Sequence, residues 1–398
     1  MTGLSRDIAP TTTHVNPIPV LTDLFTSFLR LGLTAFGGPS MVAYIRRLVV
    51  EQKHWLDEES FRDGVALCQM IPGATAMQAA AYVGLRARGV RGAVTSFIAF
   101  GLPALVLMMA LAALYTQTHT LPAVVSAFNG LQAIVIAMMA SAAVSFGRNY
   151  LKNGQHVITA LAAAALFALN VHPIVVILIS ALFGLILNNR LVTPRATSGI
   201  SSARRSAKPL LFLLAAVAAS FLLLLVVQRT LFDLAALMFR IDLFAFGGGF
   251  ASVPLMFHEI VEVRGWLDSP TFLNGIVLGQ VTPGPIVITA TFIGYLRYGP
   301  LGGLIATLGV FTPSFLLVIG TVPYFDRLRN SLAFNKAIGG ILCSFVGLLA
   351  IVTLRFAWNI PWDISRIGLA GTAFIALLRK VDVLWVVLVG AVISIVAL

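Results

Sequence analysis

The sequence contains one pattern of glycine, proline and tryptophan residues twice. The stretch Leu33–Pro39, with the sequence LTAFGGP, reappears as Leu243–Gly249, LFAFGGG, at an offset of 210 residues. Trp55 and the Leu-Asp pair after it recur at Trp266. Chance similarity between apolar helices would match Leu, Val and Ala instead. The chain is therefore an internal duplication, and its fold must be built from two copies of one unit.

The composition places both copies in a membrane. Hydrophobic residues make up 59% of the 398 residues and charged residues 11%, with a mean hydropathy of +0.95, whereas soluble domains carry about 25% charged residues. Between Asp63 and Asp233 there is no Asp or Glu, which argues against a catalytic acid pair and hence against a membrane enzyme. Cys68 and Cys343 lie far apart, outside any CxxC motif, so we expect no cofactor and no metal.

The duplication and the local composition divide the chain into five segments. A loop rich in Arg, Ser and Thr separates the two copies, and the apolar stretch 210–227, which has no counterpart, is just long enough to span a bilayer. We predict a flexible N-terminal tail (1–19), a first repeat (20–190), a basic cytoplasmic linker (191–209), a connecting transmembrane helix (210–229) and a second repeat (230–398).

The distribution of Arg and Lys predicts opposite orientations for the two repeats. Loops 86–91 and 148–152 of the first repeat are basic and loop 116–120 is uncharged, whereas the second-repeat counterpart of the uncharged loop, 326–336, is basic. Basic loops face the cytoplasm, so the unmatched helix inverts the second repeat. The predicted fold is an all-α integral membrane protein with two inverted-topology repeats, broken helices, short helical hairpins and about 10–13 membrane segments, as in secondary transporters.

The end of the first repeat predicts a short hairpin. The stretch 155–189 must leave and return to the basic side, yet it is short for two full spans of about 20 residues each. We therefore expect two short helices that turn near Asn170-Val171-His172-Pro173.

The first two hydrophobic segments of each repeat are interrupted at matched positions. The breaks are Phe36-Gly37-Gly38-Pro39 and Pro72-Gly73 in the first repeat, and Phe246-Gly247-Gly248-Gly249 and Pro283-Gly284 in the second. A helix that restarts after a break offers free N–H groups to an anion, and paired breaks indicate a transporter site. Close helix packing at the glycines is the alternative. Whether these segments span the membrane or re-enter stays open at this point.

Polar residues near the breaks complete the predicted site. Arg30 and Arg240 stand at matched positions, six residues before each Phe-Gly-Gly, and an arginine inside a membrane segment is functional or snorkels to the interface. Gln69 and Gln280 precede each Pro-Gly by three residues and can donate to an oxyanion. The predicted substrate-binding residues are Arg30, Phe36, Gly37, Gly38, Pro39, Gln69, Pro72, Gly73, Arg240, Phe246, Gly247, Gly248, Gly249, Gln280, Pro283 and Gly284.

Further charged positions recur near the segment ends, and their first interpretation is structural. We expect them to form salt bridges or helix caps, with a proton or gating role as the alternative. The six histidines do not recur, so none is a strong proton-relay candidate. The recurring pairs are Glu51 with Glu262, Lys53 with Arg264 and Asp57 with Asp268.

With these motifs the sequence resembles the chromate ion transporter family. The resemblance rests on Leu31–Pro39, Ala66–Gly73, Phe246–Gly249, Gln280–Pro285 and Ala290–Tyr295, in this order and in both halves. It implies an inner-membrane carrier of bacteria that exports chromate and is built from inverted duplicated domains. Export of a dianion from a cell that is negative inside gains about 4.6 kcal/mol per 100 mV, so the membrane potential can drive it, with proton exchange as a further coupling.

Other functions and partners follow less directly from the sequence. A carrier of sulfate or another oxyanion would keep the same fold and site, and duplicated inverted halves also build channels. Besides the oxyanion, the expected partner is the lipid bilayer. The net charge of +12 is explained by basic cytoplasmic loops, so we expect no nucleic acid, and a homodimer remains open.

Overall fold

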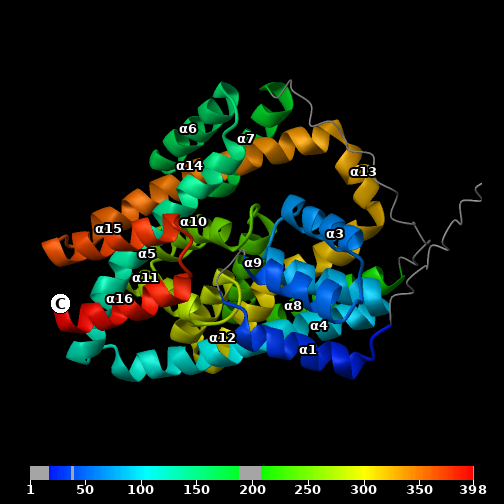
Figure 1. Cartoon of the computed structure of the whole chain (residues 1–398), viewed down its shortest axis with the longest axis horizontal. Helices are drawn as coiled ribbons and strands as arrows, with labels where there is room; N and C mark the ends of the chain where they lie inside the picture. The colour runs from blue at the N-terminus through cyan, green and yellow to red at the C-terminus, as the bar shows by residue number, and fades with distance from the viewer. Residues whose placement is uncertain (1–17, 37–39, 188–207, 398) are drawn as a thin grey trace, which may run out of the picture.

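The computed structural model describes residues 18–36, 40–187 and 208–397, and every regular element in these ranges is helical (Figure 1). This confirms the predicted all-α class. The predictions for Gly37, Gly38 and Pro39, for the tail up to residue 17 and for the linker up to residue 207 lie outside the described residues.

Both repeats contain the same order of main helices, and the second repeat has additional short elements between them. The first repeat comprises α1 (Leu21–Thr34), α2 (Ser40–Arg46), the π-helical turn η1 (Arg47–Gln52), α3 (Glu58–Met70), α4 (Thr75–Thr118), α5 (Pro122–Tyr150), α6 (Gly154–Ala168) and α7 (Pro173–Leu187). After α8 (Lys208–Val227), the second repeat comprises α9 (Arg229–Leu243), η2 (Gly249–Ala251), α10 (Ser252–Phe257), η3 (His258–Val263), α11 (Ser269–Val281), η4 (Ile286–Ile288), α12 (Thr289–Thr321), η5 (Val322–Tyr324), α13 (Phe325–Asn330), α14 (Leu332–Asn359), α15 (Ile364–Leu378) and α16 (Val383–Ala397).

The helices α4 and α12 each fold back on themselves. They turn at Gly89, with φ 66° and ψ −156°, and at Gly299, with φ 64° and ψ −159°, a backbone region that only glycine adopts readily. A Cβ atom on Gly84 would lie 2.2 Å from the carbonyl oxygen of Gly92, although eight residues of straight helix cover about 12 Å. Each helix is therefore a short limb followed by a long limb that runs back beside it.

The two interrupted segments of each repeat re-enter the membrane. In the first repeat, Lys53 Nζ lies 2.9 Å from Asp23 Oδ1, which brings the end of η1 back to the start of α1. The Tyr82 hydroxyl donates to the Ser60 carbonyl at 2.9 Å, so the short limb of α4 returns to the start of α3. Helices α1 and α3 have 14 and 13 residues, or about 20 Å, less than the roughly 30 Å of a bilayer core. These elements thus form two re-entrant hairpins, and Pro72-Gly73 lies at the tip of the second one.

Local sequence explains where the second hairpin of each repeat begins. The Asp57 carboxylate accepts a hydrogen bond from the Ser60 amide at 2.7 Å, and Asp268 accepts one from Thr271 at 2.9 Å. Each aspartate caps a free N–H group at the helix start. The predicted capping role of this recurring pair is confirmed.

The equivalent long limbs of α4 and α12 run in opposite directions. Phe97 packs against Phe311 and Phe315, with ring centroids 6.2 and 5.0 Å apart. A Cβ atom on Gly303 would lie 2.5 Å from the sulfur of Met109. Residue numbers thus rise along α4 as they fall along α12, which confirms the inverted repeats. The turns at Gly89 and Gly299 lie at opposite ends of the molecule, and we call these ends the Arg88 face and the Arg297 face.

The terminal hairpin of each repeat packs on the other repeat. In Figure 1, α6 and α7 flank α14, and α15 and α16 lie beside α5. The contacts are reciprocal, because Gly340 on α14 closely approaches Gly184, and Gly130 on α5 approaches Ser394 in the same way. The turn of the first of these hairpins contains Asn170 with φ 62°, between α6 and α7, so the short hairpin expected from the sequence is confirmed.

Within the described ranges, five helical stretches are long and apolar enough to cross a membrane. They are Thr75–Thr118, Pro122–Tyr150, Lys208–Val227, Ile286–Asn330 and Leu332–Asn359. Among the described residues of α8 none is buried in the protein, so its apolar side chains are left to face lipid. The chain is a multi-pass membrane protein.

Candidate functional site

The tips of the re-entrant hairpins meet between the repeats. The Gly73 amide at the tip of the α3–α4 hairpin donates to the Ala245 carbonyl at 2.9 Å, beside the Phe246–Gly249 break of the other repeat. The equivalent Gly284 amide donates to the Ala35 carbonyl at 3.2 Å. These two reciprocal hydrogen bonds place breaks from both repeats at one point, which we call the junction.

The first-repeat tip is surrounded by polar groups at the junction. The Ala74 amide donates to the Ser314 hydroxyl oxygen at 2.9 Å. Ser314 in turn donates to Asp242 Oδ2, from its amide at 3.0 Å and from its hydroxyl at 2.7 Å. The Gln78 amide group donates to the Pro72 carbonyl at 2.5 Å. Gly73, with φ 117°, has no room for a side chain, because its Cβ would lie 2.1 Å from the Ser314 hydroxyl.

The second-repeat tip meets apolar groups at the equivalent place. A Cβ atom on Gly284 would lie 2.8 Å from the Cβ atom of Ala104, which stands where the other repeat has Ser314. Gly32 stands where the other repeat has Asp242, and it packs directly on the backbone of Phe100. The junction therefore has one polar side and one apolar side.

The other predicted site residues at the tips and breaks are buried or half-buried. Pro72 and Pro283 are buried at the two tips, while Phe36 and Phe246 are half-buried. A Cβ atom on Gly248 would lie 3.4 Å from Thr75 of the opposite tip, and one on Gly249 would lie 2.7 Å from Ile286; Gly247 has φ 93°.

The two glutamines differ although they were predicted together. Gln280 is buried, and its Nε2 has no hydrogen-bond partner among the described residues. Gln69 is exposed on α3. The structure thus brings Gln280 into the protein near the junction and leaves Gln69 at the surface of its hairpin.

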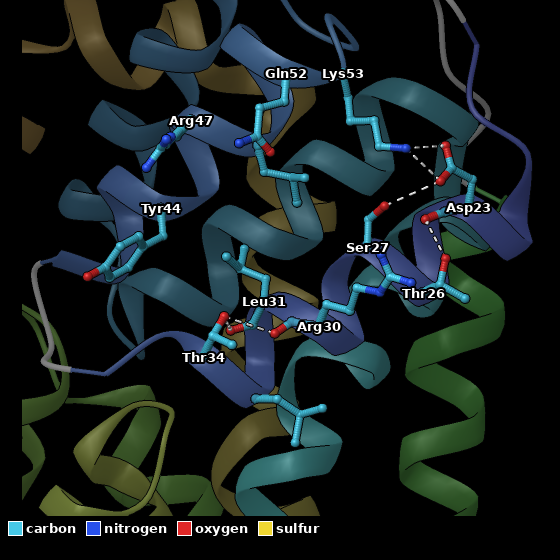
Figure 2. A pocket seen from close by; sticks show the side chains of 12 residues that line it. Asp23, Thr26, Ser27, Arg30, Leu31, Thr34, Tyr44, Arg47, Gln52 and Lys53 are labelled. Atoms are coloured by element: carbon cyan, nitrogen blue, oxygen red, sulfur yellow. Dashed lines mark hydrogen bonds and ion pairs between the residues drawn. The ribbon is translucent and has the colours of Figure 1, made fainter.

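A cavity of about 670 Å³ opens beside the first hairpin of the first repeat. Figure 2 shows Arg30 on α1 at one side and Tyr44, Arg47 and Gln52 from α2 and η1 at the other. The cavity lies toward the Arg88 face, because Arg88 Nε donates to the Pro19 carbonyl just before α1.

The cavity carries uncompensated positive charge. Lys53 is paired with Asp23 at 2.9 Å. Among the residues that the structure describes, neither Arg30 nor Arg47 forms an ion pair, and both are exposed. Two free guanidinium groups therefore line an open, water-accessible hollow, where they can attract an anion.

The equivalent region of the second repeat is filled by ion pairs, which we call the Glu259 cluster. Glu259 is 4% exposed and its carboxylate contacts three cationic or titratable side chains, while Glu262 contacts two more. The pairs are Glu259 with Arg240, with His172 at 3.1 Å and with Arg264 at 3.5 Å, and Glu262 with His258 at 2.8 Å and with Arg355.

The Glu259 cluster lies at the opposite end from the cavity. Arg264 and Arg297 stack on the same Trp266 ring, 5.1 and 5.9 Å from its centroid, which places the end of η3 at the Arg297 face. Burial opposes ionisation of Glu262, but the hydrogen bond with His258 and the charge of Arg355 outweigh it and lower the pKa of Glu262 below its ordinary value.

Three functional candidates were missed by sequence reasoning: Asp242, Glu259 and His172. Asp242 and Glu259 are acids of one repeat only, and His172 is matched by a different polar residue, Asp382. A search for identical recurring residues overlooks such positions. A signal was present, because Asp242 aligns with Gly32 and Glu259 aligns with Leu48. Among the described residues no group of three or more His, Cys, Asp and Glu side chains is arranged to hold a metal ion.

Comparison with known proteins identifies the duplicated unit. The family model described as "Chromate transporter" matches residues 22–185 and again residues 232–395. An uncharacterised transporter of Methanocaldococcus jannaschii is 42% identical over 379 residues, covering 94% of each chain. A chromate transport protein of Pseudomonas aeruginosa is 31% identical, covering 89% of this chain and 85% of the relative.

The similarity extends to more distant relatives. A chromate transport protein of Cupriavidus metallidurans is 27% identical, covering 96% of this chain and 95% of the relative. No solved structure matches the chain. Because the family model covers both inverted repeats, each with its re-entrant hairpins, the chain belongs to the chromate transporter family.

Proposed function

We propose that this protein is a secondary transporter that exports chromate or a similar oxyanion from the cytoplasm across the bacterial inner membrane. The observation that carries the proposal is the match of both repeats to the chromate transporter family, together with the open cationic cavity beside the first hairpin of the first repeat. Relatives from two bacteria that align along most of the chain are named chromate transport proteins.

The sidedness of the proposal rests on the basic loops. Arg86, Arg88 and Arg91 lie at the fold-back turn of α4. Arg148 lies in the last turn of α5, which returns to the same face, and Lys152 follows it. Basic residues close to membrane segments favour the cytoplasmic side. The Arg88 face is then cytoplasmic, the cavity with Arg30 opens to the cytoplasm, and the Glu259 cluster lies outside.

The cavity is suited to collect an oxyanion from the cytoplasm. Guanidinium groups donate parallel hydrogen bonds that fit oxyanions, and neither Arg30 nor Arg47 is neutralised by an acid among the described residues. From the cavity the anion passes to the junction, where α4 and α12 begin after the tips at Gly73 and Gly284. Helix starts carry free N–H groups and a positive dipole end, which stabilise a negative charge.

The Glu259 cluster acts as the closed exit in this arrangement. Arg240 occupies the position of Arg30, but Glu259 neutralises it and adds a negative charge of its own. The described conformation is then the one open to the cytoplasm. Release to the outside requires that the Arg240–Glu259 pair separate as the two repeats exchange conformations, which inverted repeats do in alternating access.

The membrane potential is sufficient to drive export. A dianion that leaves a negative interior gains about 4.6 kcal/mol per 100 mV, which corresponds to roughly three decades of concentration. Import of the same ion would need several co-transported cations. Export therefore follows from the charge of the substrate and the direction of the field.

Flux in inside-out vesicles tests the proposal. Vesicles that contain the protein should accumulate chromate when the interior is made positive, and an imposed pH gradient should be applied separately from the potential. Sulfate in the same assay decides the substrate preference, and saturable counterflow distinguishes a carrier from a channel. Chromate uptake no faster than in vesicles without the protein would overturn the proposed function.

A further inference from the structure

One buried carboxylate lies at the junction. Asp242, near the end of α9, is 0% exposed. Its Oδ2 accepts two hydrogen bonds from Ser314, at 3.0 Å and 2.7 Å, whereas its Oδ1 has no partner among the described residues. The Oε1 of Gln78, from the adjacent tip, is also without a partner in the described part of the chain. Buried polar atoms without partners are rare in proteins and require an explanation.

The elements packed against Asp242 bring it no positive charge. Helix α10 has no charged residue, and the only charged residue of α12 is Arg297, which lies at the Arg297 face. Helix α8 carries only Lys208, at its first residue, and the tip contributes the neutral amide of Gln78. On α9 itself, Arg240 is paired within the Glu259 cluster. Among the described residues Asp242 forms no ion pair.

The fold does not require an acid at this position. The first repeat has Gly32 and Ala104 at the equivalent positions, and the Gly284 tip still packs beside them. Asp242 and Ser314 therefore replace two small residues that the same backbone accommodates. A carboxylate buried without a counter-ion is costly, and ionisable residues inside membranes mark ion or proton pathways.

We propose that Asp242 is the proton-binding site of this transporter and that its protonation is linked to the oxyanion at the junction, an inference that rests on the proposed function. A proton needs only one oxygen, and Asp242 Oδ1 is available, whereas a metal cation needs several. Oδ2 is already occupied by two donors of Ser314, whose hydrogens repel a cation. The observations favour a proton over sodium for this reason.

The sign of the linkage follows from charge. Asp242 lies directly behind the Gly73 tip, because a Cβ atom on Gly73 would be 3.1 Å from its Oδ2. An anion at the junction repels the ionised carboxylate and favours its protonated form. Binding of the anion therefore takes up a proton, and the two bind together. This sign favours joint movement of proton and anion over the proton exchange that the sequence suggested.

Proton uptake on substrate binding tests the linkage without a transport assay. The purified full-length protein in weak buffer receives chromate, and the pH change and the bound chromate are measured in the same sample. At a pH between the ionisation midpoints of the free and the anion-bound protein, the wild type should take up as much as one proton per bound anion. Asp242→Asn should bind chromate without proton uptake. Asp233→Asn, which removes an exposed acid from the same helix, should behave like the wild type.

A second variant guards against misfolding. Asp242→Gly combined with Ser314→Ala copies the arrangement that the first repeat already uses, so it should insert and also lose proton uptake. Chromate binding by the wild type without proton uptake, or equal uptake by the wild type and Asp242→Asn, would overturn the linkage and leave the proposed function standing. A wild type that binds no chromate would overturn the proposed function and the linkage with it. Chromate binding that requires sodium in place of the proton would also overturn the inference.

Discussion

The two repeats present the same hairpin to opposite faces but fill it differently. In the first repeat Arg30 faces an open cavity, and Leu48 stands beside it on η1. In the second repeat Glu259 occupies the position of Leu48 and pairs with Arg240. One backbone thus supports an open cationic cavity at one face and a cluster of neutralised ion pairs at the other. The duplicated scaffold provides the shared geometry, and a few unmatched side chains make the two faces differ.

The junction repeats this lesson at the centre of the molecule. The first-repeat tip at Gly73 meets Ser314 and Asp242, and the second-repeat tip at Gly284 meets Ala104. Both tips make the same hydrogen bond to the alanine just before the opposite break, Ala245 or Ala35. Recurring residues therefore build the scaffold, and residues present in only one repeat carry chemistry that a symmetric scaffold lacks.

The largest effect is expected at the tips, where both repeats make the same hydrogen bond to the opposite repeat. Gly73→Leu and Gly284→Leu should each abolish transport, because the side chain collides with the other repeat and overpacking costs about 1–3 kcal/mol in addition to the strain of a positive φ. Vesicle flux and the amount of inserted protein are the measurements. Gly371→Leu, at an exposed helical glycine with open space around it, is the control. Normal flux in both tip variants would show that the junction is not on the path.

The next effect separates the two arginines, which the sequence treats as equivalent. Loss of a charge-assisted hydrogen bond costs about 1.5–3 kcal/mol, so Arg30→Ala should weaken chromate binding roughly ten- to a hundredfold. Arg30→Lys should lose less affinity, since Lys keeps the positive charge but lacks the planar guanidinium that donates two parallel hydrogen bonds. Arg240→Ala should weaken binding less than Arg30→Ala, because Glu259 already neutralises Arg240.

Chromate affinity and flux in these variants, with Arg62→Ala as an exposed control at the Arg88 face, sharpen the comparison. Equal losses for Arg30→Ala and Arg240→Ala would mean that the ion pair at Glu259 does not distinguish the repeats. Wild-type flux in the Arg30→Ala, Arg240→Ala double variant would mean that both side chains only snorkel.

One substitution gives the first repeat the acidic residue that the second repeat has at the matched position. Leu48→Glu places the acid of the Glu259 cluster beside Arg30, and we expect it to lower chromate affinity by about tenfold, as an added like charge in a partly solvated cavity does. Leu48→Gln, of nearly the same size and uncharged, should retain most of the affinity. If both substitutions lowered chromate affinity equally, the loss would come from the shape of the side chain and not from its charge.

Much of the scaffold could be predicted from the sequence, because helix breaks and turns are marked by Gly and Pro residues. The duplication, the inverted repeats, the Asp57 cap and the turn at Asn170 all follow from such local signals. The re-entry of the hairpins and the fold-back at Gly89 could not be predicted from local signals, since they depend on close approaches such as that of Gly84 to Gly92. These contacts join residues whose sequence reads as one continuous apolar helix.

The candidate site could be predicted only where it repeats. The breaks and Arg30 recur, and they were found by that recurrence. Asp242 and Glu259 do not recur, and their importance depends on burial and on which side chains face them, which the sequence alone does not contain. Gln69 and Gln280 show the converse, because identical residues at matched positions lie in different surroundings.

The smallest effect is a pH dependence of the stability of the Glu259 cluster. The pKa of Glu262 is lowered from its ordinary value of 4.5, so its carboxylate contributes stability that is complete above that value and is lost as the pH falls below it. Acid should therefore loosen the contact between η3 and α14, which Glu262 makes through Arg355. Hydrogen exchange of residues 258–263 should rise in acid in the wild type and be raised already at neutral pH in Glu262→Gln. Equal hydrogen exchange in the two proteins at neutral pH would show that Glu262 does not stabilise the Glu259 cluster.

The central claim is that the two repeats present matched elements to opposite sides of the membrane. Single cysteines, introduced into a variant that lacks Cys68 and Cys343, should be placed at the exposed positions Arg91 and Arg297 beside the two fold-back turns. A membrane-impermeant thiol reagent applied to intact cells should label the Arg297 position and leave the Arg91 position unlabelled until the membrane is opened. Labelling of both positions from the same side would contradict the inverted arrangement and the direction of transport inferred from it.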